Sequence, residues 1–399
     1  MEEAQQQALA HYPLTRQRDL LQQTDHITLA NINRGNLPQL LFSGQATYQS
    51  EVTELGSPVD GFQIRPPKKN QYKVVADLSQ VVYDGGLSRA RKGLQQLSTQ
   101  VAQQELEVEL YRLRERISQI FLGILLLDKQ AEQAGLIKKD LAPGISKTRS
   151  QVNNGVAFRS NLDVLLAESL RADQRIRELQ AARRGLILTL GLFLNQALDT
   201  TTVFLTPAAP PLPPAISRPE LTLYQGQSLL LAGQKDLLQA RSRPQVSLFG
   251  QGGYGRPGFN FLRNEFAFFS LAGLRFTWGL DWMYTLKNEK RLLLLNDQAL
   301  GLQRETFMLN TNTELTQQMA EVQKLEQMIA SDEQIIALRA SVKRAAQAQL
   351  DNSVITSHDY IREVNAEDQA RQTLILHQLQ LLQARIHYQN LAGFTPLQK

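Results

Sequence analysis

The sequence predicts an α+β protein in which pairs of β-strands are followed by long antiparallel α-helical hairpins. Three observations support this fold class: the chain is internally duplicated, each half contains an unusually long helical pattern, and each half contains strand-like segments. An internal repeat determines the architecture of a chain more strongly than any single element does. We predict a first repeat at 1–205, a proline-rich linker at 206–219 and a second repeat at 220–399. The prolines of the linker exclude a regular helix or a central strand there.

The two halves contain matching strand-like segments. Residues 37–48 and 243–254 each begin with Pro-Gln, and Gly, Gln and Tyr recur in them at the same spacing. A loop and a second strand-like run, 72–83 or 266–278, follow each segment. Each half is therefore expected to contain one strand pair.

A very long helical pattern follows each strand pair, at 87–152 and at 284–350. Apolar residues recur every three or four positions in the second pattern, which places them in one stripe of a helix. A helical pattern much longer than about 25 residues indicates a coiled coil or a similar packed array. Pro143-Gly144 lies inside the first pattern, so we expect a kink or a break there.

Both long helices are expected to end at turns that lead into return helices at 161–195 and 358–391. Gly155 can adopt the left-handed conformation that ends a helix. Ser160-x-x-Asp163 and Thr356-x-x-Asp359 both have the spacing of an N-cap residue with an acidic residue at N3. We therefore predict that both pairs cap the return helices.

The composition excludes several classes of function. The chain of 399 residues has 43 basic and 38 acidic side chains, and these are spread along it without the basic tract that nucleic-acid binding needs. The absence of cysteine excludes disulfides, thiolate metal sites and cysteine nucleophiles. Its five histidines lack the spacing of a zinc motif. We expect no enzyme activity because no nucleophile, base and orienting group form a recognisable set. No cofactor and no metal are expected either.

The sequence contains neither a long apolar run nor a recognisable secretory signal. The longest apolar runs, 121–127 and 185–194, are shorter than the roughly 20 residues of a spanning helix. The first residues lack the basic and apolar regions of a secretory signal, so the protein either stays in the cytoplasm or has lost a signal. An acylated cysteine that precedes residue 1 in a precursor would also leave no trace in this sequence.

The last strand-like run has apolar residues at its even-numbered positions, and aromatic residues gather near its two ends. One apolar face with a period of two suits a strand that faces lipid or that packs on another sheet. Membrane barrels place aromatic girdles at both interfaces. The residues expected in such a girdle are Phe259, Phe261, Phe266, Phe268, Trp278 and Trp282. The alternative is an ordinary β-sandwich core.

The number of strands constrains the membrane interpretation. Transmembrane barrels start at about eight strands, and an unclosed sheet in lipid leaves backbone groups unpaired at several kcal/mol each. Four strands per chain therefore require that chains share one barrel. Two chains would supply about eight strands and three about twelve, and only the larger barrel leaves an open lumen.

With these features in place, the chain resembles the TolC-like outer-membrane efflux channel family. The likeness rests on the duplicated Pro-Gln strand openings, on the segment at 81–86 that leads into the first long helix, and on the turn of Gly155 with Asp163. The second turn matches the family pattern Gly-x-Ile-Ser/Thr-x-x-Asp, except that Ser353 replaces glycine. The likeness extends from about residue 20 to residue 394.

The resemblance implies a homotrimer with a shared twelve-stranded β-barrel in the outer membrane and an α-helical barrel in the periplasm, where most of the chain would lie. Helices at 3–32 and 221–240 would join the linker in a belt around the helical barrel. Family members are passive export ducts of tripartite efflux or type I secretion systems in Gram-negative bacteria. The implied partners are outer-membrane lipid, a periplasmic adaptor and an inner-membrane RND or ABC transporter.

The resemblance also makes the two turns the periplasmic tip and gate. The expected tip and gate residues are Gly155, Ser160, Asp163, Ser353, Thr356, Asp359 and Arg362. The expected adaptor contacts are Val156, Ala157, Val354 and Ile355. A trimer would repeat each aspartate of the turns in a ring, and rings of carboxylates favour cations.

A soluble coiled-coil scaffold with no transport role is the alternative function. Such a scaffold would need neither the aromatic ends of the strands nor the matched strand pair in each half. The sequence indicates neither the exported substrate nor the class of pump.

Overall fold

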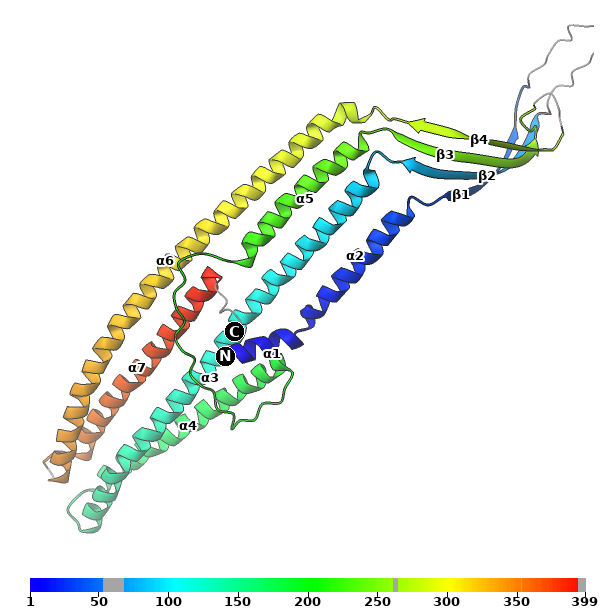
Figure 1. Cartoon of the computed structure of the whole chain (residues 1–399). Helices are drawn as coiled ribbons and strands as arrows, with labels where there is room; N and C mark the ends of the chain where they lie inside the picture. Colours follow the sequence, from blue (N-terminus) through cyan, green and yellow to red (C-terminus); the bar gives the residue numbers. More distant parts are fainter. Residues whose placement is uncertain (53–67, 261–264, 353, 394–399) are drawn as a thin grey trace, which may run out of the picture. The chain divides into compact units, whose positions relative to one another are not determined.

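The computed structural model describes residues 1–52, 68–260, 265–352 and 354–393 (Figure 1). It is mostly helical and contains one four-stranded antiparallel sheet. The chain divides into a helical unit, Met1–Arg18, Gln104–Leu223 and Gln303–Lys399, and a sheet unit, Asp19–Gln103 and Tyr224–Leu302. Both units contain segments from both halves of the sequence, and the division into two repeats stays a prediction. Among the described residues, none of the helices has both the length and the hydropathy of a membrane-spanning segment.

The sheet unit confirms both strand pairs and joins them into one sheet of order β1-β2-β3-β4, in which every neighbouring pair is antiparallel. The strands are β1 Gln39–Tyr48, β2 Asn70–Tyr83, β3 Gln245–Arg256 and β4 Ala267–Thr277. The link between the halves is the pairing of β2 with β3.

The register gives the sheet one predominantly apolar face. Along one cross-strand row Val74 pairs with Tyr254, which pairs in turn with Phe268. In an antiparallel sheet directly opposed residues lie on the same face. The large apolar side chains of this face are exposed: Leu40, Phe42, Val74, Leu78, Leu248, Tyr254, Phe268, Leu274 and Phe276. No other described segment of the chain covers them.

The opposite face of the sheet is mixed and contains polar pairs. Gln251 Nε2 donates a hydrogen bond of 2.6 Å to Asp77 Oδ1 across β2 and β3. The guanidinium of Arg275 lies 4.8 Å from the ring centroid of Phe249. The two faces therefore differ in chemistry, as the alternation of apolar and polar residues predicts.

The long helices and their return helices are confirmed with bounds close to those expected. They are α3 Leu87–Asn153, α4 Arg159–Leu194, α6 Trp282–Asp351 and α7 Ser357–Ala392. The helix α5, Pro219–Arg241, is also confirmed and follows a linker without regular secondary structure. Buried side chains such as Ile117 of α3 and Ile187 of α4 form the core between the first long helix and its return helix.

Of the kink or break expected at Pro143-Gly144, the break is wrong, because α3 runs through Pro143 as a helix, and the kink stays a prediction. A proline inside a helix removes one backbone hydrogen bond and crowds the preceding turn. Neighbouring helices support this turn of α3: the Tyr360 hydroxyl donates to Asp140 O at 3.3 Å, and a Cβ on Gly144 would lie 3.4 Å from the Tyr360 ring. Tyr360 of α7 therefore packs directly against the turn that contains Pro143.

A single helix at 3–32 is also wrong. The structure has α1 Glu2–His11, a 3-10 turn η1 Pro13–Arg16, and α2 Gln17–Arg34. Proline disfavours helical geometry at the residue before it. Tyr12 accordingly has an extended conformation with ψ 128°.

Candidate functional site

The two turns between long helices lie at the same end of the helical unit (Figure 1). They share one hydrophobic core. All four helices contribute buried residues to it: Leu141, Leu165, Ala346, Leu350, Tyr360, Ile361 and Val364. We call this part of the molecule the tip. It contains most of the residues for which the sequence predicts a function.

The first turn of the tip is closed by Gly155, as expected. Gly155 has φ +75°, Val156 N donates to Gln151 O at 2.9 Å, and Gly155 N donates to Val152 O at 3.1 Å. These two bonds define a Schellman motif. In the second turn Val354 N donates to Gln349 O at 2.8 Å, over the same number of residues. Ser353 lies outside the described residues.

The second return helix begins with the predicted cap. Thr356 is the N-cap of α7, and its Oγ1 accepts a 3.3 Å hydrogen bond from Asp359 N. Asp359 Oδ2 accepts in turn from Thr356 N at 3.2 Å. Hydrogen bonds from the Thr356 hydroxyl and backbone lower the pKa of the Asp359 carboxyl from its ordinary value. The carboxylate is therefore held in its charged form at neutral pH.

The predicted capping role of Ser160 and Asp163 is wrong. The N-cap of α4 is Phe158, so Ser160 and Asp163 both lie inside the helix. No side chain caps this helix end. Phe158 has the extended conformation of an N-cap, φ −75° and ψ 145°, because the chain leaves the Gly155 turn in that geometry. Asp163 is exposed near the start of α4 and has no capping function.

Charged residues that the sequence did not single out connect the helices of the tip. Glu367 of α7 is only 2 % exposed, and its carboxylate lies 2.6 Å from Lys343 Nζ of α6 and 2.7 Å from Arg371. Lys343 also lies 2.9 Å from Asp140 of α3. Burial would raise the pKa of Glu367, but the hydrogen bonds from Lys343 and Arg371 outweigh it and lower that pKa. We call Asp140, Lys343, Glu367 and Arg371 the tip ion cluster.

Arg362 lies at the edge of this region rather than in the ion cluster. Its Nε is 3.1 Å from Glu363 Oε1, and Arg339 of α6 lies 3.7 Å from the other oxygen of Glu363. Arg362 is exposed. Its side chain is therefore available to solvent at the surface of α7.

The expected adaptor contacts differ in exposure. Val156 and Val354 are 71 % and 70 % exposed, whereas Ile355 packs against the core of the tip and Ala157 is half-buried. Phe158, which no sequence motif marks as a contact residue, is 80 % exposed. Residues in a turn are exposed on average, but the exposed fraction of each side chain depends on the direction in which it points. The apolar surface of the tip is therefore formed by Val156, Phe158 and Val354.

The predicted aromatic girdle residues lie in the sheet unit but not in one group. Phe266 stacks with Tyr254 at 5.6 Å, and Phe268 contacts the same tyrosine at 4.7 Å. Phe259 instead contacts Phe269, 4.6 Å away, on the mixed face. At the other end of β4, Trp278 Nε1 donates to Ser242 O at 3.1 Å.

The remaining two girdle positions are Trp282, which is the first residue of α6, and Phe261, which lies outside the described residues.

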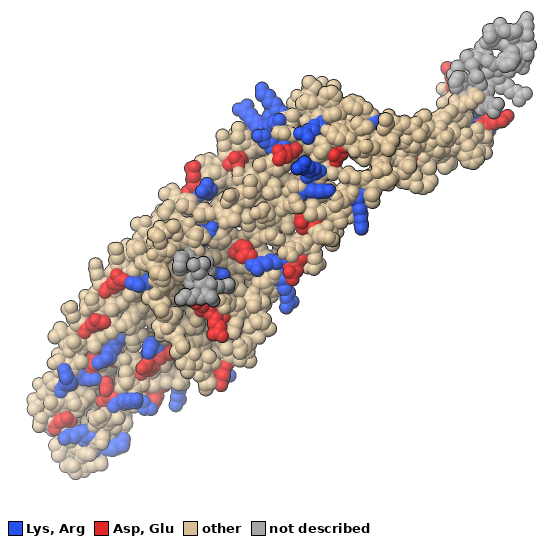
Figure 2. Space-filling view, in the orientation of Figure 1, with Lys and Arg blue, Asp and Glu red and all other residues tan. Residues whose placement is uncertain are grey.

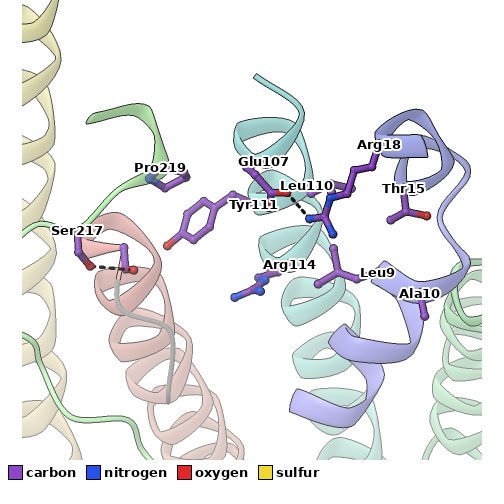
Figure 3. Close-up of a pocket in the computed structure, with 11 residues that line it drawn as sticks. Leu9, Ala10, Thr15, Arg18, Glu107, Leu110, Tyr111, Arg114, Ser217 and Pro219 are labelled. Atoms are coloured by element: carbon purple, nitrogen blue, oxygen red, sulfur yellow. Dashed lines mark hydrogen bonds and ion pairs between the residues drawn. The ribbon is translucent and has the colours of Figure 1, made fainter. Parts of the chain in front are cut away.

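A cavity of about 530 Å³ lies in the helical unit away from the tip (Figure 3). Arg18 forms an ion pair with Glu107 at its wall, and Ser217 Oγ donates to Gly393 O at 3.1 Å. Tyr111 and Arg114 of α3 also line it. Among the described residues no group of three His, Cys, Asp or Glu could hold a metal ion.

No family model and no curated protein matches the sequence. Solved structures do match the fold. The outer membrane protein VceC of Vibrio cholerae is 14 % identical, with a TM-score of 0.70 over 97 % of this chain and 95 % of that chain. The MtrE outer membrane channel of Neisseria gonorrhoeae, in its open state, is 14 % identical, with a TM-score of 0.69 over 98 % of this chain and 88 % of that chain.

The CmeC outer membrane channel of Campylobacter jejuni is 12 % identical, with a TM-score of 0.68 over 100 % of this chain and 87 % of that chain. At such low identity the likeness concerns the fold, and it extends over both units. This chain therefore has the fold of the solved outer-membrane channels, which is the fold implied by its resemblance to the TolC-like family.

Proposed function

We propose that the chain is one protomer of a homotrimeric outer-membrane channel, a passive export duct of a tripartite efflux or type I secretion system. The duct is opened by a periplasmic adaptor and an inner-membrane RND or ABC transporter. In this proposal most of the chain lies in the periplasm, and three sheets form one twelve-stranded barrel. The role is that of a conduit and not of an enzyme, in keeping with neighbours that are channel proteins.

The observation that carries the proposal is the sheet, whose apolar face no other described segment covers. Leaving Phe268 87 % exposed to water is unfavourable, since burial of such a side chain gains about 1.5–3 kcal/mol. The strands are 10 to 14 residues long, and a membrane-spanning strand needs about 9–11. Lipid is thus a suitable environment for this face.

The edges of the sheet support sharing between chains. β1 and β4 each pair with one neighbour only within the described chain. Unpaired edge groups in a bilayer cost several kcal/mol each, so β4 of one protomer has to pair with β1 of the next. The polar pairs of the mixed face, such as Asp77 with Gln251, would then face a water-filled lumen.

The tip is the proposed docking site for the adaptor. Val156, Phe158 and Val354 offer an exposed apolar surface at the end of two helical hairpins, which a partner hairpin can contact. Asp163 is not used as a cap, so its carboxylate is available to form a ring in the trimer. Arg362 would lie next to the Asp359 ring.

The first experiment is the mass of the purified protein in detergent, followed by withdrawal of the detergent. A particle of three chains that aggregates on withdrawal supports the shared barrel. A monomer or dimer that stays dispersed without detergent supports the coiled-coil scaffold and would rule out the channel. Conductance of the trimer in planar bilayers then tests for an open lumen.

A further inference from the structure

The sheet unit contains a band of basic side chains at the helix ends that adjoin the sheet. Figure 2 shows Lys and Arg side chains gathered over these helix ends, with some Asp and Glu side chains among them, whereas the sheet itself presents few charges. We call these residues the basic band: Arg34, Arg89, Arg91, Lys92, Arg241, Lys287, Lys290 and Arg291. In the part of the chain that the structure describes, none of them forms an ion pair.

Helix stability explains only part of this band. Arg34 and Arg241 end α2 and α5, where cations interact favourably with the helix dipole. Arg89 instead lies in the first turn of α3, where the dipole disfavours cations, and Arg91 and Lys92 lie in the second turn. The first turn of α3 contains no acidic residue. Neither the helix dipole nor an ion pair of the described residues therefore accounts for these three charges.

A cavity of about 770 Å³ lies at the same level, and both Arg89 and Lys92 line it. Its other polar walls include Asn36 and Ser88, whose side chains share a 2.9 Å hydrogen bond. Asp84 is the acidic residue of the lining, and its two oxygens already accept hydrogen bonds from Gly86 N at 2.9 Å and Ser88 N at 2.6 Å. The cavity therefore contains two cations and one carboxylate, whose oxygens are already hydrogen-bonded, and the positive balance favours an anion.

The cavity opens beside the apolar face of the sheet. Gln80 and Val82 line it. Gln80 lies opposite Leu248 of the apolar face, and Val82 lies at the register shift that follows in β2. Val82 is exposed. At the same end of the sheet Trp278 is exposed, with its indole nitrogen bonded to Ser242 O. The order along the sheet unit is thus apolar face, tryptophan, basic band.

This order matches one leaflet of a phospholipid bilayer, in which acyl chains, interfacial region and phosphate groups succeed one another. We infer that the basic band, with the cavity at Arg89 and Lys92, binds the phosphate groups of anionic phospholipids in the leaflet nearer to the helices. At 1.5 Å per residue, these two residues lie within about 8 Å of the start of α3, comparable to the depth of a headgroup layer. The inference rests on the proposed function, because it requires the sheet to lie in the membrane.

The test measures binding of short-chain phosphatidylglycerol and phosphatidylcholine to the trimer in an uncharged detergent. The variant is Arg89→Gln with Lys92→Gln. The matched control is Arg177→Gln with Arg184→Gln, which removes the same charge from exposed positions of α4 that form no ion pair among the described residues. Loss of two phosphate contacts should weaken phosphatidylglycerol binding about 30-fold at low salt. The control and the charge-retaining pair Arg89→Lys with Lys92→Arg should bind as the unaltered protein does.

Three results would overturn the inference: equal binding of both lipids, unchanged binding in the Arg89 and Lys92 variant, or competition by inorganic phosphate at the same concentration as the lipid. The last result would indicate a site for free phosphate. Flotation with phosphatidylcholine vesicles shows whether the protein inserts into a membrane at all. It therefore distinguishes a failure of the lipid-binding inference from a failure of the proposed channel function. A protein that does not insert refutes both proposals, whereas a protein that inserts without preferring phosphatidylglycerol refutes only this one.

Discussion

The carboxylate of Asp359 accepts hydrogen bonds from both the backbone nitrogen and the hydroxyl of Thr356, at 3.2 and 2.7 Å, while Asp359 N donates back to Thr356 Oγ1. The two residues thus satisfy each other's polar groups at the start of α7. Ser160 and Asp163 have the same spacing in the other half, yet both lie inside α4. Matching sequence patterns in the two repeats therefore have different structural roles.

The reciprocal cap predicts a stability difference between the halves. Thr356→Ala should destabilise the tip by about 1 kcal/mol, because the Asp359 backbone donor and the Asp359 carboxylate each lose a hydrogen bond to the Thr356 hydroxyl. Ser160→Ala should change stability by less than about 0.5 kcal/mol. Amide exchange in the first turn of α7 and of α4 measures both effects. Equal protection in the two variants would show that the cap has no energetic role.

The tip ion cluster predicts a larger effect. Lys343→Met should cost roughly 1–3 kcal/mol, since it leaves the buried carboxylate of Glu367 with fewer hydrogen bonds. Lys324→Met is the matched control, because Lys324 pairs with Glu321 on the surface of α6, where such pairs contribute below about 1 kcal/mol. Thermal unfolding of the detergent-solubilised protein compares the two. A Lys343 variant as stable as the control would contradict the prediction.

The same cluster predicts a dependence on pH. The pKa of Glu367 is lowered from 4.5, so its carboxylate contributes stability that is present above pH 4.5 and is lost as the pH falls through the folded value. Glu367→Gln should therefore flatten the acid side of the stability profile. An unchanged profile would show that other carboxylates account for the acid sensitivity.

A second pair predicts a loss of stability on the alkaline side. His387 Nδ1 lies 3.1 Å from Glu115 Oε1, and this hydrogen bond raises the pKa of His387 from 6.5. The pair's contribution is present below pH 6.5 and is lost as the pH rises through the folded value. Both side chains are partly exposed, so the effect should stay below about 1 kcal/mol and weaken with salt.

Glu115→Gln should make the unfolding midpoint less sensitive to pH as the pH rises above 6.5. Glu333→Gln, at an exposed position of α6, serves as the control. If both variants follow the unaltered protein, the His387 pair does not contribute.

The apolar surface of the tip predicts which substitutions separate docking from folding. Val156→Asp and Val354→Asp should weaken crosslinking to the adaptor while the trimer survives, because both side chains are exposed. Ile355→Asp should also destabilise the tip, since Ile355 packs against its core. Gln180→Glu on the exposed surface of α4 is the control. Normal crosslinking of the Val156 and Val354 variants would contradict the docking proposal.

The sequence alone predicts the type and the approximate bounds of the elements that have long regular patterns. The stripe on α6 and the period of two in β4 extend far enough to fix element type and approximate bounds. The break at Tyr12 and the continuity of α3 through Pro143 were missed, because the effect of a proline depends on its neighbours. The prediction for Ser160 was wrong because spacing does not reveal which residue has the extended conformation of an N-cap.

The tip ion cluster could not have been predicted from the sequence. Asp140 and Lys343 are 203 residues apart in the chain, and neither lies in a motif. Their proximity depends on how α3 packs against α6 and α7, which no local pattern encodes. The exposed position of Phe158 likewise depends on the exit geometry of the Gly155 turn.

Asp163 provides a test of the gate that is independent of folding. It is exposed on α4 and takes no part in a cap, so Asp163→Asn should change stability by less than about 0.5 kcal/mol. If the trimer places this residue in a ring at the lumen, the substitution removes a ring of negative charge and should lower the selectivity for cations. The reversal potential of single channels under a potassium chloride gradient measures this, with Glu333→Gln as the control. An unchanged reversal potential would exclude a gate role for Asp163 and leave Asp359 as the remaining carboxylate ring.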